Sequence, residues 1–379
     1  MEDVEIDGTV VVGLGGIGSA AALALADRGE TVVGLDPRPA GHTEGSSHGP
    51  TRLVRRAYFE DPAYVPMTTR AWDLWRELER RSGEHLLTAS GVVSVAASGD
   101  AARLVQATLE AAARYGLPVE HLGAAGLRER WPALTVPDDW DGVFEPDAGF
   151  VDPEATVRVL QRLAVAAGAE LRAEAVLSIE HGPAPVVVTA SVRYRPRRVV
   201  LAAGPWAPAL LAGRLPLTVM RKVVAHFTPL DARDLGPERM PGFVISEPDA
   251  FHYGFPLLCG DGVKIARHDG GEPTTPATVD REVHEDEVAA LRRVLERVLP
   301  AAAGPLLKAY TCLYTMSPDC DFLLGPLPGS PGCIVATGCS GHAFKFVPLL
   351  GEVLADLALG RRPAVDVGFL CPARFAAAR

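Results

Sequence analysis

The stretch that decides the fold is TVVVGLGGIGSAAALALADRGETVVGLD, residues 9–36. It opens with a β-branched run typical of a buried strand, passes through the glycine-rich turn 13–18, and then becomes rich in alanine and leucine as far as Gly29. A second apolar run over 31–35 ends at Asp36. The order strand, glycine turn, helix and strand predicts a βαβ unit that binds a dinucleotide.

The glycines and the acid of this unit each have a physical task. Gly13 permits the tight turn, Gly15 lets the backbone approach a pyrophosphate, and Gly18 lets the helix pack on the strand. The helix N-terminus supplies amide donors to phosphate oxygens. Asp36 ends the second strand, where a carboxylate can accept from ribose hydroxyls and disfavours a 2′-phosphate. An ordinary glycine-rich turn of an α/β protein would need neither this acid nor this position in the first strand.

The glycines do not distinguish NAD from FAD, but the segment EGSSHGPTR, residues 44–52, does better. It places small and hydroxyl residues with His48 and Arg52 on a second loop. A nicotinamide that exchanges has little need of a second phosphate grip, whereas an extended FAD has to be enclosed along its length. The segment therefore favours FAD.

Length and charge restrict the remaining possibilities. With 379 residues the chain exceeds the size of one hydrophobic core, so two lobes are expected. Lys plus Arg number 37 against 47 for Asp plus Glu, and the resulting net charge of −10 disfavours nucleic acid or an anionic membrane as partner.

Targeting and metal signals are also absent from the sequence. The N-terminus is acidic and no apolar run approaches the ~20 residues of a membrane span, so we expect a cytoplasmic protein. The six cysteines form no CxxC pair and have no histidines at zinc-ligand spacing, which predicts reduced thiols and no metal site.

The rest of the chain reads as alternating short elements. Helices are expected over 66–83 and 152–168, with a charged, exposed helix over 280–297 and a last helix over about 344–359. Strands are expected at 91–95, 217–227, 243–246, 251–255, 262–267 and 333–337. Nucleotide-binding features fall at the start, near 198–206 and at the end. We therefore predict a discontinuous FAD-binding domain (1–85, 145–212 and 310–379) and a substrate domain (86–144 and 213–309).

At this point the chain resembles the monomeric sarcosine oxidase and N-methyltryptophan oxidase family of flavoenzymes. The matching pieces are GLGGIG with Asp36, GSSHGPTRLVRRAY, RWPAL, FEPDAGFVDP, VVLAAGPWAP, YGFP, VKIARH, CLYTMSPD and GCSGHAFKF, in this order. The resemblance implies a two-domain α/β fold: a Rossmann-like FAD domain and a mixed β-sheet substrate domain in a p-hydroxybenzoate-hydroxylase-like arrangement. It also implies a monomer that acts on a small amino acid with O2.

The resemblance carries cofactor contacts onto matching positions. They are Gly13, Gly15, Gly16, Ile17, Gly18, Asp36, Ser46, Ser47, His48, Thr51, Arg52, Val176, Cys312, Tyr314, Gly341, His342, Phe344 and Lys345. Cys312 matches the cysteine that the family joins through sulfur to the flavin, although by composition alone it would be an ordinary buried thiol. Tyr314 follows it by two, so both side chains would face the same side of a strand.

Arg55 and Lys345 match the pair that holds the substrate carboxylate. A guanidinium can grip a carboxylate through two nitrogens, and an ammonium adds a point charge. The two cations have no nearby acid in the sequence, which favours an anionic ligand. The alternative for Arg55 is a place in a surface basic run with Arg52 and Arg56, whereas Lys345, between two phenylalanines, is poorly placed for solvation alone.

Four further residues match catalytic positions: Lys264, His268, Tyr253 and Arg52. Lys264 matches the oxygen-activating lysine, whose fixed charge stabilises negative charge as O2 is reduced. Without the motif it would read as a strand lysine facing water. His268 and Tyr253 match pocket residues that orient the amine in its neutral form, while lone residues of these types are more often structural.

Several positions depart from the family pattern. Val244 and Cys339 are smaller than their counterparts in the sarcosine enzymes, so a pocket lined by both would have extra room, and Arg56 and Pro50 also differ. We expect an FAD-dependent oxidase of a secondary amino acid, N-methylated or cyclic, that yields an imine and hydrogen peroxide. The alternatives are a biosynthetic oxidase of a cyclic imino acid, an oxygen-insensitive dehydrogenase of the same fold, and a non-catalytic, redox-sensing FAD protein.

Overall fold

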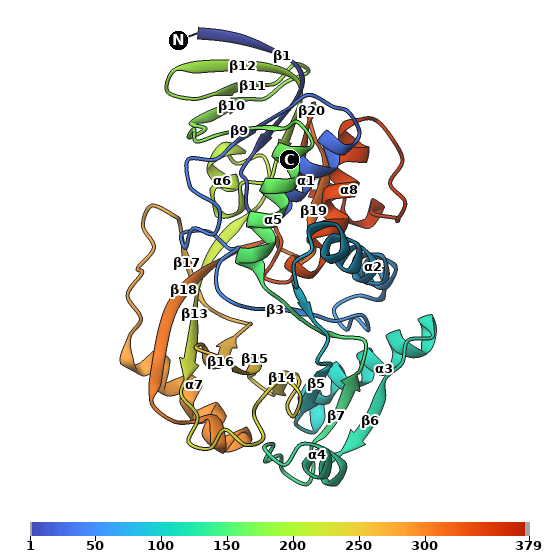
Figure 1. Cartoon of the computed structure of the whole chain (residues 1–379), viewed down its shortest axis with the longest axis vertical. Coiled ribbons are helices and arrows are strands. Elements are labelled where there is room, and N and C mark those ends of the chain that lie inside the picture. Colours follow the sequence, from blue (N-terminus) through green and yellow to red (C-terminus); the bar gives the residue numbers. More distant parts are fainter. Residues whose placement is uncertain (1, 376–379) are drawn as a thin grey trace.

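Two large sheets, one in each lobe, organise the fold (Figure 1). The structure is a computed structural model that describes residues 2–375. A small three-stranded sheet of β3 (Arg52–Val54), β4 (Leu87–Thr88) and β8 (Gly149–Val151) is separate from both. In Figure 1 its strand β3 lies between the two lobes. Of the predicted site residues, Arg52 is the first residue of β3 and Arg55 directly follows the strand.

The first sheet has eight strands, in the order β10-β11-β12-β1-β2-β9 with β20 on β12 and β19 on β20. They are β1 (Glu2–Val12), β2 (Val32–Leu35), β9 (Glu170–Arg172), β10 (Ser178–Glu180), β11 (Val186–Val188), β12 (Val192–Leu201), β19 (Leu323–Leu327) and β20 (Ser330–Thr337). The central strands β2, β1, β12 and β20 run parallel, and their apolar residues are buried on both faces.

Helices cover one face of this sheet. Helix α1 (Gly16–Asp27) packs between α5 (Pro153–Ala166) and α8 (Val347–Ala358), and α2 (Val65–Ser82) packs on α8. The short helix α6 (Ala207–Leu210) contributes to the core on the other face. The parallel strands therefore present their carboxyl ends, beside the N-terminus of α1, as a place for a ligand.

The second sheet has nine strands, in the order β17-β13-β16-β15-β14-β5-β7-β6 with β18 on β13. They are β5 (Val92–Ala96), β6 (Glu120–Gly123), β7 (Asp141–Glu145), β13 (Thr218–Phe227), β14 (Gly242–Glu247), β15 (Ala250–Leu258), β16 (Gly262–Arg267), β17 (Glu272–Thr274) and β18 (Leu306–Met316). Only β14 and β5 pair in parallel here; the other pairs are antiparallel. Helices α3 (Arg103–Tyr115), α4 (Ala124–Arg130) and α7 (Glu285–Val298) pack against this lobe.

The mixed α/β fold class is confirmed, and two expected helices begin later than predicted. Helix α7 starts at Glu285, since His284 and Glu287 form a capping box there, and it buries Leu291 and Leu295 although the whole segment was expected to be exposed. The last segment opens with a 3₁₀ turn over 344–346, and α8 begins at Val347, next to a proline that suits a first helical turn.

The predicted domain boundary at 309/310 falls inside a strand. Strand β18 pairs with β13 along most of its length, which places residues 310–316 in the second sheet. The division into domains remains a prediction. Within residues 2–375, no helix combines the length and apolarity needed to cross a membrane.

Candidate functional site

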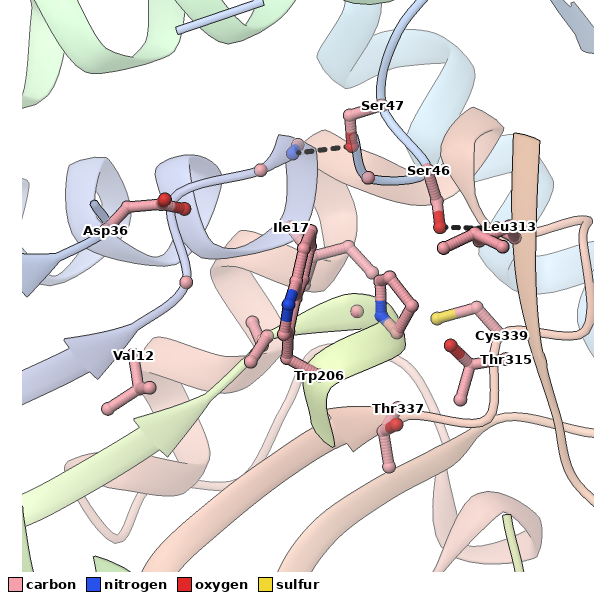
Figure 2. A pocket seen from close by; sticks show the side chains of 18 of the residues that line it. Val12, Ile17, Asp36, Ser46, Ser47, Trp206, Leu313, Thr315, Thr337 and Cys339 are labelled. Carbon is pink, nitrogen blue, oxygen red and sulfur yellow. Dashed lines mark hydrogen bonds between the residues drawn. The ribbon is translucent and has the colours of Figure 1, made fainter. Parts of the chain in front are cut away.

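The glycine turn after β1 has the geometry that its sequence predicts. Gly13 has a φ of +90°, and a Cβ on Gly18 would lie 1.8 Å from the Gly13 carbonyl oxygen, so neither position accepts a side chain without strain. The Gly16 amide, at the start of α1, donates to Ser47 Oγ at 3.1 Å (Figure 2). Asp36 accepts from the Leu14 amide at 2.8 Å, so the acid also fixes the turn.

A cavity of about 660 Å³ extends from this turn toward the second sheet. In Figure 2, Asp36 lies at one end of the view and Thr315 and Cys339 at the other. The hydroxyls of Thr315 and Thr337 line the cavity, are buried, and have no hydrogen-bond partner among the described residues. Such orphaned hydroxyls, beside an open glycine cradle, fit an elongated ligand with polar atoms along its length, and a dinucleotide such as FAD meets that description.

Most of the predicted cofactor residues line this cavity. They are Gly13, Gly15, Gly16, Ile17, Asp36, Ser46, Ser47, Arg52, Val176, Tyr314, Gly341 and Phe344. The others do not line it: Gly18 faces the turn, and His48, Thr51, Cys312, His342 and Lys345 lie outside the lining.

Sequence reasoning assigned no role to Trp206, Arg38, His42, Thr315 and Thr337, all of which line the large cavity. The Arg38 guanidinium lies 4.2 Å from the centroid of the Trp206 ring, and the His42 ring lies 6.2 Å from the same ring. Trp206 belongs to the segment VVLAAGPWAP, which matched the family, but the sequence did not indicate that its side chain lines the cavity.

A second, smaller cavity of about 60 Å³ adjoins the first. The two share Arg52, Tyr314, Gly341 and Phe344 in their linings. The smaller cavity is also lined by Leu53, Arg55, Glu60, Val244, Phe251, Tyr253, His268, His342 and Lys345. The structure therefore brings together the predicted substrate residues Arg55, Lys345, Tyr253, His268 and Val244. Cys339 differs from this expectation, because it lines the large cavity and not the small one.

Two buried cations face the small cavity. Arg55 donates through Nη2 to Glu60 at 2.9 Å, while its Nη1 is buried without a partner in the described residues. Lys345 Nζ donates to the His342 carbonyl at 2.9 Å and to the Tyr58 hydroxyl at 3.2 Å. Burial, and then the neighbouring Arg55, lower the pKa of Lys345 to about 7.

The expectation that no acid lies near these cations is wrong. Glu60 lines the small cavity, and although burial opposes ionisation, Arg55 and Lys345 together lower the pKa of its carboxyl. Glu145, at the end of β7, lies fully buried behind them and accepts from the amides of Arg56 at 3.0 Å and Ala57 at 2.8 Å. Glu60 stands five residues after Arg55 in the sequence, and the loop after β3 turns it back onto the guanidinium.

Aromatic and imidazole groups form a further part of the lining of the small cavity. The hydroxyls of Tyr253 and Tyr314 lie 3.3 Å apart, and the rings of His268 and Tyr314 have centroids 5.5 Å apart. Burial, followed by the positive neighbourhood of His342, lowers the pKa of His268 to about 3. His268 is therefore neutral at pH 7 and can accept a hydrogen bond.

Lys264 lies in the buried middle of the second sheet. Its strand β16 is enclosed between β13 and β15, so the water-facing alternative is wrong. Its Nζ donates to the backbone oxygen of Thr51 at 3.0 Å and to the Thr51 hydroxyl at 3.1 Å. Burial and the nearby Arg52 hold the pKa of Lys264 well below its usual range.

Arg52 organises the loop before it. Its guanidinium donates to the carbonyls of Ser46 at 2.9 Å, His48 at 2.7 Å and Thr51 at 2.8 Å, and lies 4.0 Å from Cys312 Sγ. Arg52 thus holds the second loop through three hydrogen bonds and lies close to Cys312, and it lines both cavities. In the part of the chain that the structure describes, no group of three or more His, Cys, Asp or Glu side chains could hold a metal ion.

Comparison with known proteins gives a consistent result. Residues 9–357 match the family described as DAO, FAD dependent oxidoreductase. The chain is 40% identical to monomeric sarcosine oxidase of Streptomyces avermitilis over 97% of its own length and 98% of the relative. It is 36% identical to N-methyl-L-tryptophan oxidase of Yersinia pestis, with coverage of 97% and 98%. The solved structure of NikD, an unusual amino acid oxidase essential for nikkomycin biosynthesis, aligns with a TM-score of 0.85 at 28% identity over 98% of both chains.

Proposed function

The chain belongs to the DAO family of FAD-dependent oxidoreductases, and on this premise we propose that it oxidises a small secondary amino acid, N-methylated or cyclic, with O2 as the electron acceptor. The observation that carries the proposal is the small cavity beside the large one: Lys345 and Arg55 both line it, and Arg55 Nη1 has no hydrogen-bond partner among residues 2–375. A buried guanidinium nitrogen without a partner is costly unless an anion completes it.

The large cavity suits FAD. The glycine turn and Ser47 would hold the pyrophosphate, Asp36 the ribose, and the orphaned hydroxyls of Thr315 and Thr337 further polar atoms. Bound there, FAD would supply the redox chemistry: the substrate carbon would lose a hydride equivalent, which is two electrons and one proton, and O2 would be reduced to hydrogen peroxide by two electrons and two protons. Cys312 is our candidate for a covalent attachment, because it lies two residues before the cavity-lining Tyr314 on the same face of β18.

The small cavity would orient the substrate by its carboxylate. Arg55 Nη1 and the Lys345 ammonium bind the anion, and Glu60 keeps Arg55 Nη2 in place. The neutral His268 and the tyrosine pair, which also line the cavity, can orient the amine through hydrogen bonds, and the buried cations Arg55 and Lys345 disfavour a positive charge on it, so the uncharged, reactive form is favoured. The small volume of this cavity, about 60 Å³, favours a small amino acid over one with an indole side chain.

Lys264 is our candidate for the residue that promotes O2 reduction. Its Nζ is fixed on Thr51, outside the small cavity, so in its protonated form it can stabilise negative charge as oxygen is reduced without contacting the substrate. A cytoplasmic location and a monomeric state are part of the proposal.

A panel of amines tests the function. The holoenzyme is assayed for hydrogen peroxide with sarcosine, N-methylalanine, proline, pipecolate and N-methyltryptophan. We expect turnover of small members and none of N-methyltryptophan. Turnover of only cyclic compounds would select the second candidate, a biosynthetic oxidase of a cyclic imino acid, which the structural similarity to NikD favours. No reaction with any secondary amino acid would contradict both.

Two further measurements test the oxygen and covalent parts. Lys264→Met should slow reoxidation of the reduced enzyme in air, whereas a dehydrogenase that ignores O2 would show slow reoxidation already in the parent protein. Acid precipitation should leave the yellow colour in the pellet of the parent protein and release it from Cys312→Ser. Colour in the parent supernatant would remove the covalent link.

A further inference from the structure

Lys222 is a buried lysine that lines neither cavity. It lies on β13, is 5% exposed, and points its Nζ at three successive carbonyls: His268 at 2.6 Å, Asp269 at 2.9 Å and Gly270 at 2.5 Å. These bonds use all three protons of the ammonium. The segment 268–271 that follows β16 therefore forms a carbonyl cage around one cation.

The cage depends on two glycines. Gly270 and Gly271 have φ values of 62° and 98°, and a Cβ on Gly271 would lie 2.7 Å from the Arg221 carbonyl oxygen. The same Cβ would lie 3.2 Å from Lys222 Cδ, so the turn wraps closely around the lysine stem. Because the side chain is enclosed, removing the ammonium would leave three carbonyls that lose their common donor.

The cage is also tied to the wall of the small cavity. Lys222 Nζ lies 5.1 Å from the centroid of the Tyr314 ring, within reach of a cation–π interaction. The first residue of the cage is His268, whose amide donates to the Phe251 carbonyl at 2.7 Å. His268, Tyr314 and Phe251 all line the small cavity. Burial lowers the pKa of Lys222 to about 8, partly offset by Asp269, so the side chain is mostly charged at pH 7.

We propose that Lys222 is a positioning residue of the active site: its ammonium clamps residues 268–270 to the ring of Tyr314 and so holds His268 in place against the substrate amine. The role of His268 rests on the proposed function, whereas the clamp itself does not. A shift of the His268 ring by a fraction of its length would misplace the acceptor for the amine and slow the step in which the substrate is oxidised.

The chain offers a matched control in the next residue. Arg221 is also 5% exposed and also donates to loop carbonyls, including Asp280 at 2.8 Å and Glu282, and it pairs with Glu287. Adjacent residues of a strand point to opposite faces, and Arg221 holds the segment before α7, which lines neither cavity. Its loss should cost stability without reaching His268.

The experiment compares Lys222→Met, Lys222→Arg and Arg221→Met as holoenzymes. Hydrogen exchange is measured by mass spectrometry, and the anaerobic rate of flavin bleaching by substrate is measured separately from reoxidation by O2. For Lys222→Met we expect about tenfold faster exchange over 268–271 and about 10- to 100-fold slower bleaching, with reoxidation unchanged. Lys222→Arg, which keeps the charge, should recover part of the bleaching rate. Arg221→Met should speed exchange over 280–287 and leave bleaching unchanged.

Three results would overturn the inference: unchanged exchange over 268–271 in Lys222→Met, equal slowing of bleaching by Arg221→Met, or equal loss in both half-reactions. If Lys222→Met does not fold, Lys222→Gln, which retains an amide donor of similar length, is measured in its place. If the parent protein oxidises no secondary amino acid, the proposed function fails, but the exchange measurement still decides whether the clamp exists.

Discussion

The large and small cavities share four lining residues and are built on opposite principles. The large one is bounded in good part by the backbone and short side chains of the glycine turns near 13–16 and 338–341 and of the loop 44–47, although Arg38, His42 and Trp206 also line it. The small one is bounded by long ionic and aromatic side chains from β3, β14, β15 and the segments after β16 and β20. Steric fit should therefore govern mutations in the large cavity, and charge should govern those in the small one.

The largest effect is expected from a side chain added to the glycine turn. Gly18→Val places a Cβ where the Gly13 carbonyl oxygen lies 1.8 Å away, so the turn cannot close and the purified protein should contain essentially no flavin. The ratio of visible to ultraviolet absorbance measures this. Gly123→Ala, with nothing within 4 Å of the new Cβ, should keep a full complement. A Gly18→Val protein that contains flavin would contradict the claim that steric fit governs the large cavity.

Removal of a cation comes next. Arg55→Met should lower the binding of the substrate carboxylate by about 2–5 kcal/mol, at least ~30-fold in KM, while flavin content is unchanged. Arg55→Lys keeps the charge but loses the two-nitrogen guanidinium, so its KM should lie between those of the parent protein and Arg55→Met. Arg70→Met, at an ion pair with Glu352 on the surface, is the control. A parent-like KM in Arg55→Met would contradict the charge half of the comparison.

The charge of the small cavity should also respond to pH. Lys345 has a pKa of about 7 without ligand, and a bound anion raises it, so affinity for a carboxylate such as acetate is highest below pH 7 and falls as pH rises. The affinity should fall by up to about tenfold per pH unit. The measurement is a titration with acetate at each pH, monitored through the flavin spectrum. Lys222, with a pKa of about 8, titrates in the same range, so the decisive comparison is Lys345→Met, which should flatten the dependence near pH 7. A parent protein whose affinity is constant from pH 6 to pH 9 would exclude the assignment.

The smallest effect is expected from an orphaned hydroxyl of the large cavity. On a Cys312→Ser background, Thr337→Val should weaken FAD binding by about 1 kcal/mol, roughly fivefold, because one hydrogen bond is lost. The apoprotein should melt no lower than its parent, since the hydroxyl has no partner among residues 2–375. Thr108→Val removes a hydrogen bond to the Leu104 carbonyl outside both cavities, so it should lower the melting temperature of the apoprotein and leave FAD binding unchanged. A lower melting temperature for Thr337→Val apoprotein would show an internal partner.

The large cavity was more predictable than the small one. The turn at 13–18, Asp36 and the second loop are local patterns whose geometry follows from glycine and from strand ends. The turn has the expected geometry, and Ser46, Ser47 and Arg52 of the loop line the cavity, whereas His48 and Thr51 do not. For the small cavity, the motifs supplied Arg55, Lys345, Tyr253 and His268, but not Glu60, since the folding back of one loop decided that contact. Cys339, which we expected beside the substrate, lines the large cavity instead; it stands two residues before Gly341, which lines both cavities.

The sequence by itself determined the fold class, the dinucleotide unit and the family, because these depend on local periodicity and on motifs that keep their order along the chain. The tertiary structure alone decided which acids accompany the cations, that Lys264 is enclosed and not exposed, and that Lys222 closes a carbonyl cage behind His268. Those contacts join residues from different strands and loops, and burial rather than spacing sets their energies, so only the packed chain fixes them.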